Sequence, residues 1–160
     1  MKSEDISILV PFVHGTVHVL KVQCFTAIKT EKPLMKANDK TPLQTDIAGI
    51  IGITSPTFNG SIALCFSEKT FLYLMSKMLG EEFTTLTPDL EDGAGEMLNM
   101  IFGYAKRVLN EKGHSFEKAL PTIVRGTGIS LSHHRGTGAV ILPFDGECGK
   151  FYMEINTETK

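Results

Sequence analysis

The sequence predicts an α+β fold in which an antiparallel sheet carries long helices packed on one face. Two observations indicate this class. Periodic apolar segments follow the order helix, strands, two helices, strands, and glycine or proline residues separate them. The 160 residues are enough to bury one continuous core, and no repeat or low-complexity tract divides them. We therefore expect a single domain over residues 1–160.

The N-terminal segment predicts a helix followed by a short extended stretch. Between Val10 and about Ala27, apolar residues recur at roughly helical spacing. Pro11 is expected in the first turn of this helix, where a missing N–H is tolerated. Residues 30–36 are expected to be extended.

Two apolar, β-rich runs then predict a hairpin. They occupy residues 47–56 and 62–67, and the connection between them contains Asn59-Gly60, a strong turn signal. Ser67 is expected to cap a helix over 68–79 that ends at Gly80.

A longer helix is predicted from Pro88 to about Lys112, ending at Gly113. Thr87 can cap its N-terminus, and Pro88 suits the first helical position. The remaining apolar runs predict three or four strands separated by glycine-rich turns, at 119–126, 128–132, 138–144 and 150–156.

The long helix has an apolar face and an opposite polar face. At about 100° per residue, one wide apolar face is predicted to meet the core. It contains Leu90, Ala94, Met97, Leu98, Ile101, Phe102, Ala105, Val108 and Leu109. The opposite face carries Asp92, Glu96, Asn99, Gly103 and Asn110. Glu96 and Asn99 are three residues apart, so both side chains rise from one patch.

Two features of this polar face favour a docking site over ordinary solvated positions. Asparagine is a poor residue for a helix interior, because its side chain competes for backbone hydrogen bonds. Gly95 and Gly103 each cost about 1 kcal/mol relative to alanine in a helix. We interpret both glycines as leaving a flat surface on which another protein can approach.

The spacing of Asp92, Glu96 and Asn99, followed by Pro121, resembles the signature of the CheC/CheX/FliY family of chemotaxis phosphatases. The resemblance is to the CheX type, because there is one Glu-x-x-Asn motif and the N-terminal helix and C-terminal strands are also similar. It covers roughly residues 10–156. It implies a CheX/CheC-like single domain that hydrolyses the aspartyl phosphate of a CheY-like response regulator.

The resemblance also implies roles for individual residues. Asn99 would orient the attacking water, and Glu96 would pair with the lysine at the regulator's phosphorylation site. Asp92, Gly95 and Gly103 are assigned to partner binding. The regulator carries the Mg²⁺ that hydrolysis needs, so no metal or cofactor of the chain's own is expected.

Other candidate sites are weaker. His14 and His18 have a spacing used for zinc, but a third ligand is missing and position 15 is glycine rather than glutamate. The run 133–135 (His-His-Arg) reads as a solvated loop, and the glycines at 136–138 lack the context of a phosphate-binding loop. Cys24, Cys65 and Cys148 are expected to be buried small hydrophobes rather than nucleophiles.

The composition excludes some classes of partner. A formal net charge of -2 without lysine runs argues against nucleic acid and against an anionic membrane surface. The cysteine spacing suits reduced thiols, and neither a signal peptide nor a membrane span is recognisable, so we expect a cytoplasmic protein.

Two alternative functions stay open from the sequence. One is a non-catalytic binding module of the chemotaxis or flagellar-switch machinery, and the other is a hydrolase of small phosphoesters. We also expect a homodimer through sheet edges, because the strands at 138–156 are strongly β-forming and are predicted to form a hairpin at an open edge.

Overall fold

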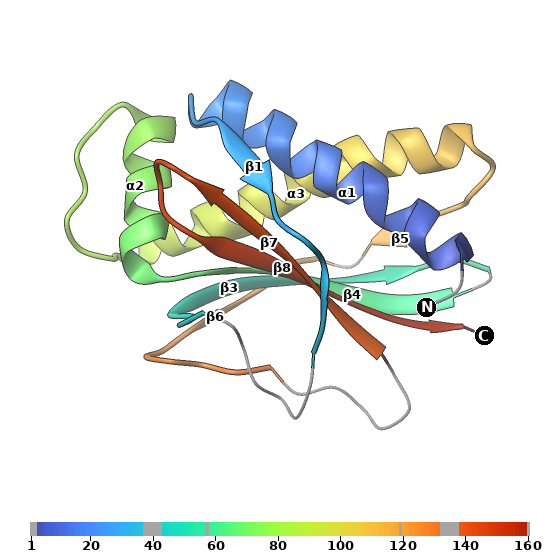
Figure 1. The fold of residues 1–160 in the computed structure, drawn as a ribbon. Helices are drawn as coiled ribbons and strands as arrows, with labels where there is room; N and C mark the ends of the chain where they lie inside the picture. Colours follow the sequence, from blue (N-terminus) through green and yellow to red (C-terminus); the bar gives the residue numbers. More distant parts are fainter. Residues whose placement is uncertain (1–2, 37–42, 57, 119, 132–137, 160) are drawn as a thin grey trace.

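Three helices cover one face of a sheet in the part of the chain that the computed structural model describes, residues 3–36, 43–56, 58–118, 120–131 and 138–159 (Figure 1). The helices are α1 (Ser3–Gln23), α2 (Glu68–Leu79) and α3 (Pro88–Glu111). The strands are β1 (Ile28–Thr30), β2 (Leu34–Met35), β3 (Ile47–Thr54), β4 (Phe58–Phe66), β5 (Glu117–Lys118), β6 (Thr122–Arg125), β7 (Gly138–Gly146) and β8 (Phe151–Thr159). The predicted fold class, an antiparallel sheet with helices on one face, is confirmed.

The sheet has long central strands and short edges. Its order is β1-β7-β8-β4-β3-β5, with β2 also paired to β7 and β6 also paired to β3. Every pairing is antiparallel. The edge strands have only two to four residues, so each presents few free backbone groups to another chain.

The main core lies between the sheet and the helices. Alternate side chains of the central strands point to this side, among them Ile51, Leu64 and Met153, which are fully buried. α1 lies along α3 and runs in the opposite direction (Figure 1). The ring centroids of Phe12 and Phe102 are 6.2 Å apart where the two helices meet. α3 therefore packs against both α1 and the sheet.

Capping residues set the helix ends that the sequence predicts. The Ser67 side chain accepts a hydrogen bond from Thr70 N, and α2 ends at Gly80 with φ 68°. The Thr87 side chain accepts from Leu90 N, and Pro88 begins α3 as expected. Local chemistry therefore fixes where the helix that carries the Glu-x-x-Asn motif begins.

α1 begins earlier than the sequence indicated. The helix starts at Ser3, so the prediction that Pro11 lies in the first turn is wrong: Pro11 is inside the helix. An interior proline removes one backbone hydrogen bond. Ile8, Leu9 and Phe12 are nevertheless buried in the main core, and this packing on both sides of Pro11 offsets the loss.

The β3–β4 hairpin exists, but its turn is displaced from the predicted one. Asn59 and Gly60 lie within β4, opposite Thr54 and Ile53 of β3. The same two residues also pair with β8 on the other side. Pairing on both edges outweighs the local turn preference of Asn-Gly, and the connection instead uses residues 55–57, of which residue 57 lies outside the described chain.

The C-terminal strands differ from the expectation in two respects. Residues 126–131 form no strand: Gly126 N donates to Asp46 O and Ile129 N to Thr45 O. Ile129 and Leu131 pack on the sheet face opposite the helices, against a second cluster that includes Tyr152. The β7–β8 hairpin is confirmed, but it does not lie at an edge. β1 and β2 pair with the free side of β7, and β4 pairs with β8.

This placement corrects the expected dimer interface. A second chain cannot add a strand to the 138–156 hairpin, because both of its sides are already paired within the chain. Sequence periodicity reveals strands but not their order, so β1 and β2 were not expected on that side. The homodimer itself stays a prediction, and pairing between strands would have to use the β1/β2 or the β5/β6 edge.

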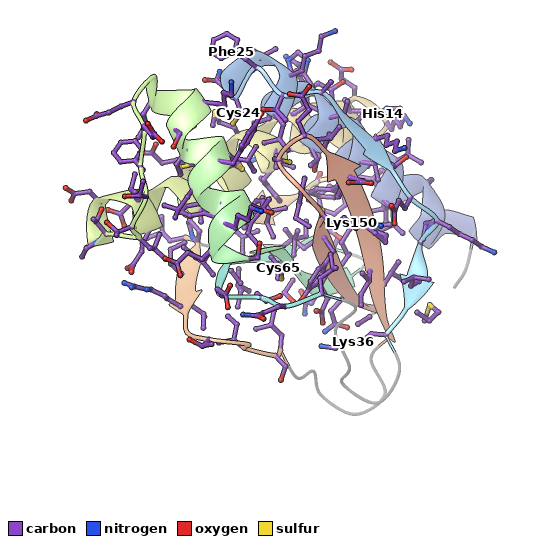
Figure 2. All side chains as sticks on the ribbon, turned by 60° about the vertical axis from the view of Figure 1, so that its left-hand side comes forward. His14, Cys24, Phe25, Lys36, Cys65 and Lys150 are labelled. Carbon is purple, nitrogen blue, oxygen red and sulfur yellow. The ribbon has the colours of Figure 1, made fainter. Side chains whose placement is uncertain are left out.

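A buried ion pair lies on the sheet face opposite the helices. Lys36 Nζ is 2.9 Å from Glu154 Oε1, and the two side chains are 3% and 0% exposed. Lys36 also donates to the carbonyl of Leu131. Figure 2 shows Lys36 on the side of the sheet away from the helices. The pair therefore joins the β2 edge, the 126–131 segment and the centre of the sheet.

We expect Lys36→Met to lower the free energy of unfolding by about 3–5 kcal/mol, because it leaves the Glu154 carboxylate buried without its cation. The matched control is Lys150→Met, which removes the exposed pair with Glu31 (3.2 Å; 53% and 37% exposed) and should cost at most about 1 kcal/mol. Urea denaturation measures both. An equal loss of unfolding free energy in the two variants would contradict the conclusion that the buried Lys36–Glu154 pair stabilises the fold.

Candidate functional site

The candidate site is the face of α3 that points away from the core. Asp92, Glu96 and Gly103 are exposed there, and Asn99 is half-buried. The predicted core face is confirmed: its members are buried, except Val108, which is half-buried. The structure therefore brings Asp92, Glu96, Asn99 and Gly103 onto one side of one helix.

Close backbone packing seats this helix on the sheet. A Cβ atom added to Gly49 of β3 would lie 3.2 Å from the carbonyl oxygen of Ala94 and 3.4 Å from its carbonyl carbon. Backbone atoms cannot move aside as the end of a side chain can, so β3 and α3 approach each other this closely only through a glycine. The next residue back, Gly93, packs against the Met75 side chain of α2. The turn of α3 just before Glu96 is thus fixed from two directions.

Gly95 fixes the same turn from a third direction. It is buried, and a Cβ there would lie 3.3 Å from Ile123 Cδ1 and 3.4 Å from Pro121 Cγ. The interpretation of Gly95 as part of an open docking surface is therefore wrong. Its missing side chain makes room for Pro121 and β6, which explains physically why a proline follows the motif.

A surface ion pair supports the same contact. Arg125 of β6 pairs with Glu91 of α3, and the two side chains are 48% and 23% exposed. At that exposure the pair contributes at most about 1 kcal/mol. It adds to the packing of Pro121 and Ile123 against α3.

Leu120 is a further candidate for partner contact that sequence reasoning missed. It is 89% exposed and directly precedes Pro121, which contacts the turn before Glu96. Its exposed apolar side chain is therefore available to a partner that approaches this turn of α3. The available signal was its position next to the proline of the motif.

The carboxylate of Glu96 is available to a partner. None of the salt bridges between described residues involves Glu96. The amide of Asn99 lies three residues further along the same face. A carboxylate and an amide on one face of a rigid helix can act on a group that another molecule brings to them, such as a phosphorylated side chain on a protein surface.

The alternative metal site gains no support. Among the described residues, no group of three or more His, Cys, Asp or Glu side chains converges. His14 and His18 are exposed on α1, and the His18 ring lies 5.2 Å from the Tyr104 ring. The histidines and arginine at 133–135 and most of the 136–138 run lie outside the described residues. The absence of an intrinsic metal stays a prediction.

The cysteines are unsuited to nucleophilic chemistry. All three are buried free thiols, as predicted. Burial raises the pKa of Cys24 and of Cys148 to about 11, and that of Cys65 to about 12. At neutral pH the reactive thiolate is therefore scarce.

None of the helices among the described residues has the length and hydrophobicity of a membrane span.

The fold and the helix-borne motif define a CheC-like α+β domain, and comparisons agree. The model of the family described as chemotaxis phosphatase CheX matches residues 47–145. A CheC-like superfamily protein from Shewanella sp. PV-4 has a similar structure, with 32% identity, TM-score 0.88 and 99% of each chain covered. The chemotaxis protein CheX from Vibrio vulnificus is 33% identical, with TM-score 0.87 over 95% of this chain and 99% of that one. A search of curated protein sequences returned no significant match.

A third similar structure contains a partner. It is the CheX–CheY–BeF₃–Mg²⁺ complex from Borrelia burgdorferi, 25% identical to this chain, with TM-score 0.76 over 95% of this chain and 97% of the matched one. The family match and the similarity to the Shewanella and Vibrio structures together establish the family. The chain belongs to the CheX family of chemotaxis phosphatases.

We expect Gly49→Ala to lower the free energy of unfolding by about 1–3 kcal/mol, because the added methyl meets the Ala94 backbone. The control is the same substitution at Gly103, where nothing lies within 4 Å of the added Cβ. Gly103→Ala should raise stability by up to about 1 kcal/mol through helix propensity. Thermal and urea unfolding of both variants provide the measurement. If Gly49→Ala left the free energy of unfolding unchanged, the close backbone contact between α3 and β3 would be contradicted.

Proposed function

We propose that this chain dephosphorylates a phosphorylated CheY-like response regulator, with Asn99 and Glu96 as the residues that act on the phosphorylation site. The observation that carries the proposal is the placement of Glu96, which is exposed, and Asn99, which is half-buried, on one face of a helix whose position is fixed by packing at Gly49 and Gly95. Membership of the CheX family and the Borrelia CheX–CheY complex support the choice of partner.

The reaction needs a positioned water more than it needs a new nucleophile. An aspartyl phosphate is an activated acyl phosphate. Attack by water forms a new P–O bond as the bond to the aspartate oxygen breaks, and a carboxylate and inorganic phosphate are released. In-line placement of that water accelerates the step. The regulator carries the Mg²⁺ that neutralises charge on the phosphoryl oxygens.

Asn99 has the right chemistry for placing the water. Its amide oxygen can accept a hydrogen bond from the water, while its NH₂ group donates to a phosphoryl oxygen. A neutral amide adds no negative charge beside an anionic group. The role is parallel to that of the glutamine that orients the attacking water in GTPases.

Glu96 is assigned to docking rather than to proton transfer. A carboxylate facing a phosphoryl group would repel it, whereas a carboxylate facing the regulator's active-site lysine attracts it. With Asn99 on the same face, that ion pair would set the distance and angle at which the amide enters. Asp92, one turn earlier, and Leu120, beside Pro121, would contact the surrounding surface.

A small-phosphoester hydrolase is less well supported. Such an enzyme normally uses a metal cluster or an activated nucleophile. The described residues contain neither a convergent metal-ligand group nor a cysteine with a low pKa. The scaffold alternative is separated from catalysis by experiment: a scaffold binds the regulator without changing the lifetime of its phosphate.

We expect Asn99→Ala to reduce kcat for regulator dephosphorylation by at least about 100-fold, because the water loses its orienting group. Glu96→Ala should raise KM and lower the rate. Glu111→Ala, which removes another exposed carboxylate of α3, should leave both unchanged. Loss of phosphate from the regulator, followed in time, gives these constants, and circular dichroism checks the fold.

Near-wild-type activity of Asn99→Ala would refute the mechanism. Wild-type protein that binds the phosphorylated regulator but leaves its phosphate lifetime unchanged would favour the scaffold alternative.

A further inference from the structure

Gly103 differs from the other glycines in the described helices. An added Cβ at Gly15 would meet the Ile101 carbonyl oxygen and Tyr104 Cδ1, each at 3.1 Å, and the close contacts of Gly93 and Gly95 are given above. At Gly103 nothing lies within 4 Å. A glycine in a helix interior costs about 1 kcal/mol relative to alanine. The packing of the described residues does not require that cost, and the open space at Gly103 is accessible to an external contact.

Gly103 borders a groove between α1 and α3 of about 280 Å³. Val19, Val22 and Met100 form its apolar part, and Val22 is 50% exposed. His18, Tyr104 and Arg107 form its polar part. Gly103 is one helical turn beyond Asn99, about 6 Å along the axis. The groove is therefore continuous with the proposed catalytic face.

Aromatic contacts hold the cationic rim of the groove in place. The Arg107 guanidinium lies 5.6 Å from the centroid of the Tyr104 ring, which the His18 ring contacts from α1. Stacking of this kind restricts the arginine side chain before a partner arrives. The contact therefore favours a position of the Arg107 charge at the rim.

The surface around the groove is basic, although the chain is slightly acidic as a whole. An adjoining groove between α1 and β1 is lined by His14, Lys21 and Lys29, and shares His18 with the first. Among the described residues, no aspartate or glutamate lines either groove, and an acidic pair, Asp145 and Glu147, lines a separate pocket that shares Lys29. Figure 2 shows His14 on the outer side of α1. This surface is complementary to an acidic partner.

We propose that the α1–α3 groove is a second contact for the phosphorylated regulator: it accepts an apolar side chain of the receiver domain, and Arg107 pairs with a carboxylate beside that side chain. The proposal rests on the proposed function. A receiver domain with an aspartyl phosphate has an acidic surface there, because carboxylates that hold Mg²⁺ surround the phosphoryl group. When Asn99 reaches that group, the basic rim of the groove faces the same acidic side of the regulator.

The groove also explains why Gly103 must lack a side chain. Any Cβ there would project into the space between the two proteins, one turn from the amide that must reach the phosphoryl group. An added side chain should therefore weaken docking while stabilising the free protein. If Gly103 had a purely structural role, a side chain there would lower both the stability of the protein and its affinity for the regulator.

The first test measures binding to the CheY-like regulator of the same organism, held in its phosphorylated form by beryllium fluoride and Mg²⁺, which separates docking from hydrolysis. We expect Gly103→Gln to weaken this binding by about tenfold or more, the scale of one blocked interface contact. Gly103→Gln should also raise the thermal midpoint of the free protein. Asn99→Ala, by contrast, should keep most of the binding.

The second test uses charge. Arg107→Gln should raise KM several-fold with little change in kcat and should reduce the dependence of KM on salt, because it removes one interfacial ion pair. Lys77→Gln is the matched control: Lys77 also lies 5.6 Å from a tyrosine ring centroid, that of Tyr73, but on α2. It should change neither KM nor its salt dependence.

Wild-type affinity in both Gly103→Gln and Arg107→Gln would overturn the groove proposal while leaving the catalytic proposal intact. If wild-type protein binds no regulator at all, the proposed function is refuted, and the groove proposal is refuted with it. If Arg107→Gln and Lys77→Gln weaken binding equally, the attraction is a general charge effect and the specific contact at the groove is refuted.

Discussion

The close contact between the backbones of α3 and β3 is the constraint on which the rest of the structure depends. Gly49 allows it from the sheet, Met75 closes on Gly93 from α2, and Pro121 closes on Gly95 from the β6 side. These contacts all fall within the turn that precedes Glu96. In the proposed mechanism the Asn99 amide must stand at a fixed distance from the regulator's phosphoryl group. A helix held by close backbone packing sets that distance more precisely than a mobile segment could.

The same constraint divides the glycines of α3 into two kinds. Gly93 and Gly95 lack side chains because the chain's own core occupies the space, and their cost in helix propensity is offset by packing. Gly103 has open space before it, and its cost has no internal compensation. Position relative to the core therefore distinguishes the two buried glycines, which the packing requires, from Gly103, which we propose leaves room for a partner.

Local signals predicted the helices and strands well, whereas pairing between distant segments determined how the strands are arranged in the sheet. The Ser67 and Thr87 caps and the amphipathic pattern of α3 were readable because they involve neighbours in sequence. Asn59-Gly60 was misread as a turn because β8 pairs with it from far along the chain. Likewise, the place of the β7–β8 hairpin inside the sheet depends on β1 and β2, which are short and exposed and carry almost no pattern. The shared helix face of Glu96 and Asn99 was predictable from their spacing, but the burial of Gly95 and the α1–α3 groove arise only when distant segments meet.

The most direct measurement is the rate of phosphate loss from the phosphorylated regulator with Asn99→Gln. This substitution keeps a neutral amide but extends the side chain by one methylene. If the packed seat of α3 sets the position of the amide, the rate should fall by at least about 100-fold, because displacement of a positioned group by about 1 Å is enough for such a loss. Binding to the beryllium fluoride form of the regulator should persist. A variant that hydrolyses the phosphate as fast as wild type would contradict the claim that the seat of α3 positions the catalytic amide.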